Sequence, residues 1–75
     1  MPRMNAYCFT LNNWTAEDRT RLEAEDENVR YIVFGEETGS QAGTPHLQGY
    51  LQLFEEEKMA VLNPRLFANR AHLQL

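Results

Sequence analysis

The chain has one cysteine, few basic residues and no long apolar segment. Cys8 alone cannot form an internal disulfide, which agrees with a reducing compartment. No apolar run approaches the ~20 residues that a membrane-spanning helix needs. The N-terminal segment also lacks the basic-then-apolar order of a secretory signal. We therefore expect a soluble, intracellular protein that makes no contact with a membrane.

Basic residues are outnumbered by acidic ones. Seven Lys and Arg against eleven Asp and Glu give a net charge of −4, whereas proteins that bind nucleic acid usually carry a basic face. Most of the acids fall in two clusters, residues 17–27 and 55–57, which can lie on solvated surfaces away from a site. The charge predicts weak affinity for nucleic acid and a shallow dependence of that affinity on salt.

Length and composition indicate a single small globular domain. A chain of 75 residues buries only about 60–65% of the surface that its unfolded form exposes, so its stability is marginal. A hydrophobic content of 43% with 24% charged residues is typical of folded proteins rather than disordered ones.

Hydrophobic periodicity and turn residues divide the chain into six elements. The predicted elements are a strand over 6–11, a helix over about 16–26, strands over 30–36 and 46–54, a helix over 64–68 and a strand over 71–75. This order is typical of an α+β, ferredoxin-like or RRM-like antiparallel sheet with two helices. The same topology serves nicking enzymes and RNA-recognition modules, so function has to be argued from side chains.

Local signals support several of these elements. Thr15 is the expected N-cap of the first helix, with Asp18 completing an approximate capping box. Asn63 and Pro64 predict the N-cap and first residue of the second helix. The apolar run in residues 31–34 predicts a central strand buried on both faces, and Cys8 is expected to be a small buried hydrophobe.

One short segment carries chemistry. On a strand, His46 and Gln48 lie on the same face, so an imidazole and an amide oxygen can meet at one divalent ion. A polar strand face is the simpler interpretation of these two residues alone. The tripeptide His46-Leu47-Gln48 recurs as His72-Leu73-Gln74. We interpret the repeat as coincidence because the second copy lacks the flanking Pro and Gly.

Three segments together resemble a known family. They are Phe9-Thr10-Leu11-Asn12-Asn13, Gly35-Glu36-Glu37 and Thr44-Pro45-His46-Leu47-Gln48-Gly49. They are similar to the first two motifs of the replication initiators (Rep) of small circular single-stranded DNA viruses of the circovirus and nanovirus kind. Members of that family are HUH endonucleases that nick and rejoin single-stranded DNA, and the similarity spans about residues 7 to 74.

The resemblance implies a metal site made by Glu37, His46 and Gln48, with Mg²⁺ or Mn²⁺ as the ion. Hairpin partners bring same-face side chains within about 5 Å, so Glu37 can meet His46. This oxygen-rich ligand set suits Mg²⁺ or Mn²⁺ better than zinc. Glu36 points to the other face of a regular strand, where a solvated or salt-bridged role is expected.

The resemblance also implies recognition of origin DNA by the first motif. The residues concerned are Phe9, Thr10, Leu11, Asn12 and Asn13. Amide side chains can reach base edges or phosphates while the aromatic ring supports the strand. The competing interpretation is that Phe9 belongs to the core and that the two asparagines form a turn.

The family's nucleophilic tyrosine motif has no counterpart here. Tyr7, Tyr31 and Tyr50 lie in predicted strands, where aromatic packing is the expected role, so no catalytic residue is assigned. We expect residues 1–75 to form a single partial Rep domain that binds an ion and single-stranded DNA but cannot form a phosphotyrosine. The resemblance further implies an origin stem-loop as the partner, a location in the host nucleus, and association into homo-oligomers through full-length Rep.

Two other functions stay open. A non-catalytic RRM-like module would bind single-stranded nucleic acid by stacking bases on sheet aromatics, and Gly49-Tyr50 matches that pattern only in part. A self-assembly module would use the edge of the sheet left open beside the last strand.

Overall fold

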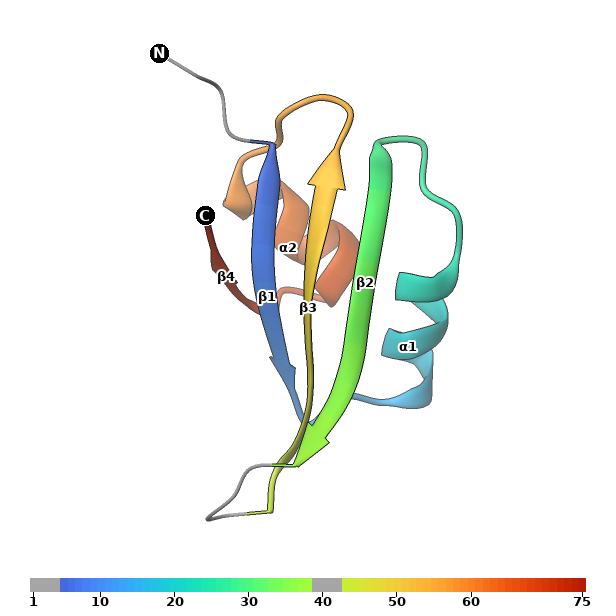
Figure 1. The fold of residues 1–75 in the computed structure, drawn as a ribbon, viewed down its shortest axis with the longest axis vertical. Coiled ribbons are helices and arrows are strands. Elements are labelled where there is room, and N and C mark those ends of the chain that lie inside the picture. Colours follow the sequence, from blue (N-terminus) through green and yellow to red (C-terminus); the bar gives the residue numbers. More distant parts are fainter. Residues whose placement is uncertain (1–4, 39–42) are drawn as a thin grey trace.

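The computed structural model describes residues 5–38 and 43–75 (Figure 1). The elements are β1 (Ala6–Asn12), α1 (Ala16–Glu23), β2 (Val29–Thr38), β3 (Pro45–Leu53), α2 (Met59–Phe67) and β4 (His72–Gln74). The order strand, helix, strand, strand, helix, strand is the predicted one.

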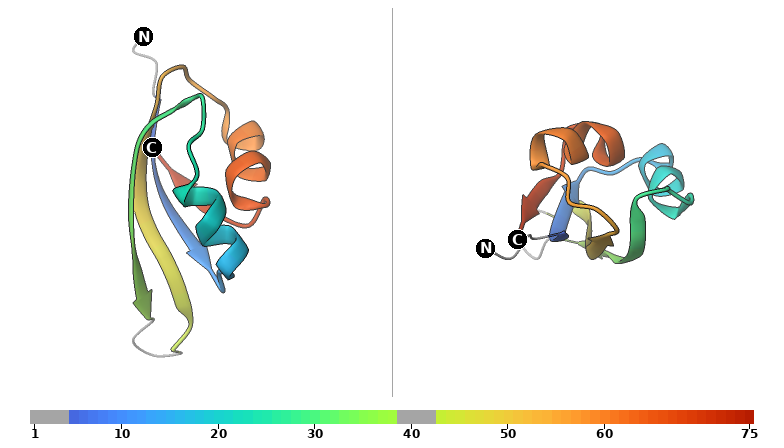
Figure 2. Two further views of the ribbon diagram at one scale, coloured as in Figure 1. Left: turned by 90° about the vertical axis from the view of Figure 1, so that its right-hand side faces the viewer. Right: turned by 90° about the horizontal axis from the view of Figure 1, so that it is seen from above.

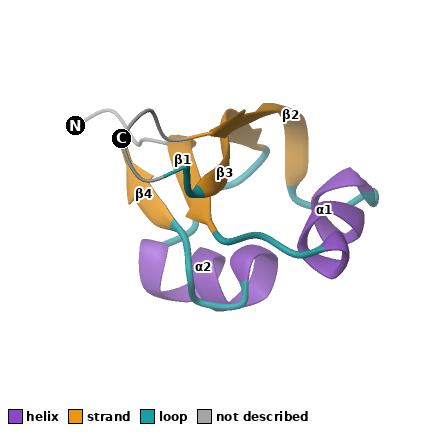
Figure 3. Ribbon diagram, turned by 90° about the horizontal axis from the view of Figure 1, so that it is seen from below, coloured by secondary structure: helices purple, strands orange, loops and turns teal. Residues whose placement is uncertain are grey.

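The four strands form one antiparallel sheet in the order β2-β3-β1-β4. Both helices cover the same face of this sheet, and no helix formed by the described residues lies on the other face (Figures 2 and 3). The predicted ferredoxin-like α+β class is confirmed. Because the cover is one-sided, each strand has to alternate between residues that face the helices and residues that face away.

The core lies between the sheet and the helices. Its buried hydrophobic residues are Tyr7, Phe9, Leu11, Leu22, Leu47, Leu51, Leu53, Leu62, Leu66 and Phe67. The Phe9 ring lies at the centre, with ring centroids 4.8 Å from Phe67 and 6.4 Å from Phe34. The three leucines of β3, Leu47, Leu51 and Leu53, are all buried, so this strand turns its apolar side chains to the helices.

Two predictions about burial are wrong. The apolar run in β2 forms an edge strand rather than a central one, so Tyr31 and Val33 are 51% and 48% exposed. Cys8 is exposed because β1 turns its odd-numbered residues to the core and neither described helix covers the opposite face. Both errors follow from local apolar composition, which does not reveal which face the helices occupy.

Helix α1 begins as predicted. The Thr15 hydroxyl accepts a hydrogen bond from the Asp18 N–H at 3.2 Å, and the Asp18 carboxylate accepts one from the Thr15 N–H at 2.8 Å. This reciprocal capping box satisfies two N–H groups that a helix start leaves unpaired. The helix ends at Glu23, three residues before the predicted end, because the backbone of the cap residue Ala24 is already extended, with ψ of 148°.

The predicted start of α2 is wrong. The helix begins at Met59, and Pro64 lies inside it, although proline removes one helical hydrogen bond. Asn63 is therefore no N-cap; its side-chain amide exchanges two hydrogen bonds with the Ala71 backbone, at 2.8 and 3.0 Å, at the entrance to β4. At eight and nine residues, neither described helix is long and apolar enough to cross a membrane.

Gly49 is required by the packing of β3. A Cβ atom built there would lie 2.2 Å from the Val33 carbonyl oxygen and 2.8 Å from Cζ of Phe9. Neither the backbone oxygen nor the buried ring can move aside cheaply. The glycine after the His-Leu-Gln tripeptide therefore serves strand pairing over the Phe9 ring.

We predict that Gly49→Ala lowers the free energy of unfolding by about 1–3 kcal/mol, because it overpacks the core. Gly35→Ala is the matched control, since a Cβ there meets nothing within 4 Å. Urea denaturation followed by circular dichroism measures both variants. Equal stability of the two variants would show that the strand shifts to accept the methyl group.

Candidate metal and nucleic-acid site

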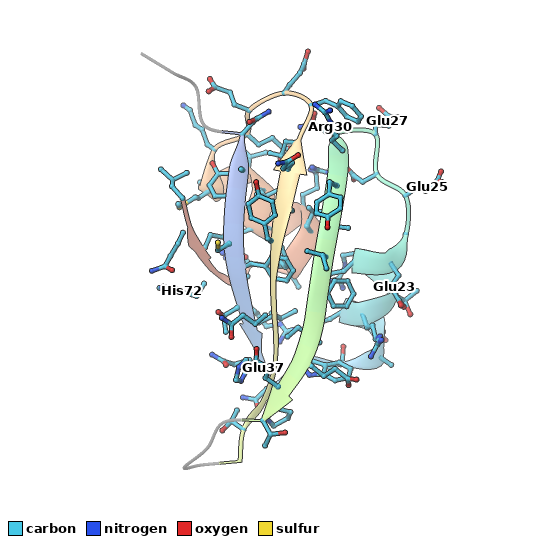
Figure 4. All side chains as sticks on the ribbon, in the orientation of Figure 1. Glu23, Glu25, Glu27, Arg30, Glu37 and His72 are labelled. Atoms are coloured by element: carbon cyan, nitrogen blue, oxygen red, sulfur yellow. The ribbon has the colours of Figure 1, made fainter. Side chains whose placement is uncertain are left out.

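The helix-free side of the sheet, here called the open face, brings the predicted site residues to one surface. Strand register and burial place on it Ala6, Cys8, Thr10, Asn12, Tyr31, Val33, Gly35, Glu37, His46, Gln48, Tyr50, Gln52, His72 and Gln74. All the strands contribute, and Figure 4 shows Glu37 and His72 on two of them.

The open face is nearly free of acidic residues. Glu37 is the one carboxylate among the residues that define it. Figure 4 shows other acids, including Glu23, Glu25 and Glu27, along α1 and the segment that follows it. The net charge of −4 is therefore concentrated away from this surface, so it does not exclude an anionic partner there.

Glu37 and His46 form the centre of the candidate metal site. They are direct partners in the β2–β3 register, and Glu37 Oε1 lies 4.0 Å from His46 Nε2. Two ligand atoms each about 2.1 Å from one ion lie about 3 Å apart when they are cis and about 4.2 Å apart when they are trans in octahedral geometry. The observed separation of 4.0 Å lies between these values, so the two side chains have to shift slightly to hold one ion. The Glu37 side chain is 58% exposed, so it is free to make such a shift.

Gln48 and Glu36 lie on opposite sides of the sheet. Gln48 is exposed two residues along β3 from His46 and on the same face. Glu36 instead pairs with Arg19 of α1 at 3.0 Å, the salt-bridged role expected for it. No cluster of three His, Cys, Asp or Glu side chains occurs among the described residues. An ion here would rely on the Gln48 amide and on ligands from outside the chain.

The first motif divides between the core and the open face. Phe9 and Leu11 are 1% and 0% exposed, so their side chains support the strand. Thr10 is the register partner of Gln48, and Asn12 is the partner of His46. A role in DNA contact stays a prediction for Thr10, Asn12 and the exposed Asn13, which lie beside the candidate metal site.

The Asp18 side chain is the centre of a hydrogen-bond network that connects α1, α2 and the segment after α2. This side chain is almost fully buried, and it accepts hydrogen bonds from Arg70, from Arg21 at 3.0 Å, and from Thr15. Arg21 also reaches the Leu66 carbonyl oxygen at 3.4 Å. A buried charge with several charge-assisted partners is satisfied rather than orphaned.

The same network reaches the start of β3. Arg70 extends to the Asn13 carbonyl oxygen at 3.5 Å, and the Asn13 N–H donates to the Pro45 carbonyl oxygen at 2.9 Å. Asn13 holds a left-handed conformation with φ of 54°, which asparagine tolerates better than most residues. Asn13 thus serves as the predicted turn residue and fixes the residue that precedes His46.

The pKa of the Asp18 carboxyl lies well below its usual range. Burial is the largest single influence and raises the pKa, but hydrogen bonds from Arg70, Thr15 and Arg21 together outweigh it. An Asp in the unfolded chain titrates at about 3.9. Since the folded pKa is the lower of the two, Asp18 stabilises the fold at pH values above about 3.9, and this stabilisation is lost as pH falls further.

We predict that Asp18→Asn lowers the free energy of unfolding by about 2–4 kcal/mol at neutral pH, because two arginines lose their buried partner. The loss should shrink as pH is lowered below about 4, where the parent protein loses the same charge. Glu23→Gln is the control, since its pair with Arg19 is exposed and worth little. Denaturation at several pH values measures this. A loss for Asp18→Asn that does not vary with pH would contradict the assignment.

His72 belongs to the open face, although its tripeptide looked like coincidence in the sequence. It lies opposite Thr10, and Gln74 lies opposite Cys8. His72 and His46 are separated by β1, so neighbouring strands about 4.8 Å apart place them roughly 10 Å or more from each other. They cannot share one ion. The repeated alternation of polar and apolar residues was the available signal for this placement.

Comparison with known proteins gives consistent matches. A family model described as "Putative viral replication protein" matches residues 4–75. The chain is 42% identical over 67 residues to the replication-associated protein of canary circovirus, covering 88% of the chain and 22% of that protein. It is 38% identical over 72 residues to Para-Rep C1 of Faba bean necrotic yellows C11 alphasatellite, covering 92% and 25%. The chain therefore spans about a quarter or less of the length of these curated relatives.

Proposed function

Because this chain belongs to the family of viral replication proteins, we propose that its open face binds a Mg²⁺ or Mn²⁺ ion and single-stranded DNA. Glu37, His46 and Gln48 would hold the ion. The observation that carries the proposal is the cross-strand pair of Glu37 and His46 at 4.0 Å, directly beside Asn12 of the neighbouring strand.

In this proposal, the residues around the Glu37–His46 pair contribute to binding of the ion or of the DNA. When bound, the ion would polarise a phosphoryl oxygen and orient the backbone. His46 would present a ring nitrogen from a strand start that Asn13 fixes through Pro45. Asn12 and Thr10 would offer donors and acceptors to phosphates or base edges next to it.

The relatives are named as replication-associated proteins, and the proposed place of this domain is at the origin DNA, in the host nucleus. Nicking and joining of the origin strand need a nucleophile as well as an ion. The Tyr7 hydroxyl is occupied by a hydrogen bond to the Glu57 carbonyl oxygen at 2.6 Å. Tyr50 lies four residues along β3 from His46, or about 13 Å. The proposed activity of this chain is therefore binding without covalent chemistry.

Ion-independent binding of single strands is the alternative function. The observation in its favour is that Tyr31 and Tyr50 both face outward on the open face, as in modules that stack bases on a sheet. The two functions differ in whether affinity for DNA depends on the ion.

We predict that Mn²⁺ tightens binding of a fluorescent single-stranded oligonucleotide, and that His46→Ala abolishes this gain while weakening Mn²⁺ affinity by at least about tenfold. His72→Ala is the matched control, because it removes the same side chain from the same face outside the proposed ion site. Fluorescence anisotropy measures the DNA, and electron paramagnetic resonance measures free Mn²⁺. Binding that ignores both Mn²⁺ and His46 would favour the ion-independent alternative.

We predict that the chain forms no covalent adduct with an origin-type oligonucleotide in the presence of Mn²⁺, because no described tyrosine lies at the proposed ion. Denaturing gel electrophoresis after incubation tests this. A band that migrates as a protein–DNA adduct and disappears in one Tyr→Phe variant would show that the tyrosine is the nucleophile and would refute the prediction.

A further inference from the structure

A pair of tyrosines lies on the open face at a distance from the proposed ion. Tyr31 of β2 is 51% exposed, and its ring centroid is 6.5 Å from that of the half-buried Tyr50 of β3. The Tyr50 hydroxyl accepts a hydrogen bond from Gln52 at 2.8 Å, and Gln52 is the register partner of Tyr31. This bond limits the freedom of one ring, while the other ring stays open to solvent.

An exposed cation, Arg30, directly precedes Tyr31 in the chain. The β2–β3 register shifts between Val29 and Tyr31, so Arg30 sits at a bulge, a feature that redirects side chains on edge strands. Arg30 makes no ion pair with any described residue. The described cations that do form ion pairs are Arg19, Arg21, Arg65 and Arg70. Figure 4 shows Arg30 at the end of β2 opposite Glu37.

We propose that Tyr31, Tyr50 and Arg30 form a second nucleic-acid contact, in which an unstacked base lies on the tyrosine pair and Arg30 binds a backbone phosphate. This inference rests on the proposed function and extends it to the far end of the open face. Tyr50 is about 13 Å from His46 along β3. One single strand crossing the face would touch the ion residues and the tyrosine pair with different nucleotides.

The surroundings favour a nucleic-acid single strand as the occupant. Gln52 and Gln74 are neutral amides at this end of the open face, while Glu27 lies beside Arg30 at the edge of β2 (Figure 4). A base offers a flat π surface and hydrogen-bonding edges that match tyrosine rings and amides. A paired base is covered by its neighbours in a duplex, so the contact requires a single strand. Stacking on an aromatic ring accepts any base, so this contact would hold the strand on the open face without selecting its sequence.

The first test uses a fluorescein-labelled oligothymidylate of about ten nucleotides and an abasic strand of the same length and charge. Tyr31→Ala should weaken binding of the oligothymidylate by about tenfold, the value of one lost stacking contact, and leave binding of the abasic strand unchanged. Tyr31→Phe keeps the ring and should bind like the parent protein. Val61→Ala is the control, because Val61 is similarly exposed, at 53%, but lies on α2.

The second test separates Arg30 from other surface charge. Arg30→Ala should reduce the slope of log affinity against log salt concentration by about 0.7, the value for one phosphate contact to a single strand. Lys58→Ala is the matched control, since Lys58 is also exposed and lies at the N-terminus of α2, on the helical side. Its slope should equal that of the parent.

The outcomes distinguish this inference from the function on which it rests. If Tyr31→Ala binds oligothymidylate as tightly as the parent while His46→Ala still abolishes the Mn²⁺ effect, the tyrosine contact is refuted and the ion site stands. If Tyr31→Ala is weakened but His46 and Mn²⁺ have no effect, the tyrosine contact stands and the ion site is refuted. Equal weakening of the abasic strand would also refute the stacking contact. Circular dichroism confirms that each variant is folded.

Discussion

The buried carboxylate of Asp18 is the interaction on which the arrangement of this small domain depends. It closes the capping box of α1 with Thr15, and it pairs with Arg21 in the same helix and with Arg70 beyond α2. A lone buried charge would be costly, so its partners have to stay in place. Arg70 also hydrogen-bonds to the Asn13 carbonyl oxygen, and the Asn13 N–H donates to the Pro45 carbonyl oxygen. The interactions that hold the helices in place therefore also hold the start of β3, where His46 lies.

One-sided cover of the sheet separates stability from binding. The helices and the inward-facing leucines of the strands form the core. The strand residues that alternate with these leucines face away from the core, so core packing does not restrict their identity. The carboxylates that form ion pairs with arginine, such as Asp18 with Arg70, and Glu36 with Arg19, lie away from the open face. A chain with a net charge of −4 can in this way keep a surface on which Glu37 is the only acid among the described strand residues.

Strand alternation made much of the fold predictable, because it reports a property that each strand has by itself. The alternation in β3 placed His46 and Gln48 on one face, and hairpin pairing placed Glu37 opposite His46, as the register shows. The predictions that were wrong depend on how distant parts of the chain pack together, which a local pattern does not report. Pro64 is accommodated inside α2 because buried residues on both sides hold that helix on the sheet. The exposure of Cys8 depends on which face the helices cover.

The open face also explains why the repeated His-Leu-Gln tripeptide has two different consequences. In both copies the leucine faces the core, fully buried at Leu47 and partly buried at Leu73, and the polar residues face outward, so the pattern itself encodes only a half-buried strand. His46 acquires a carboxylate partner because β3 lies beside β2. His72 lies on β4, at the edge of the described sheet, with β1 as its only described neighbour. Chemistry at this surface is therefore set by strand order, which places a carboxylate beside one histidine and a threonine beside the other.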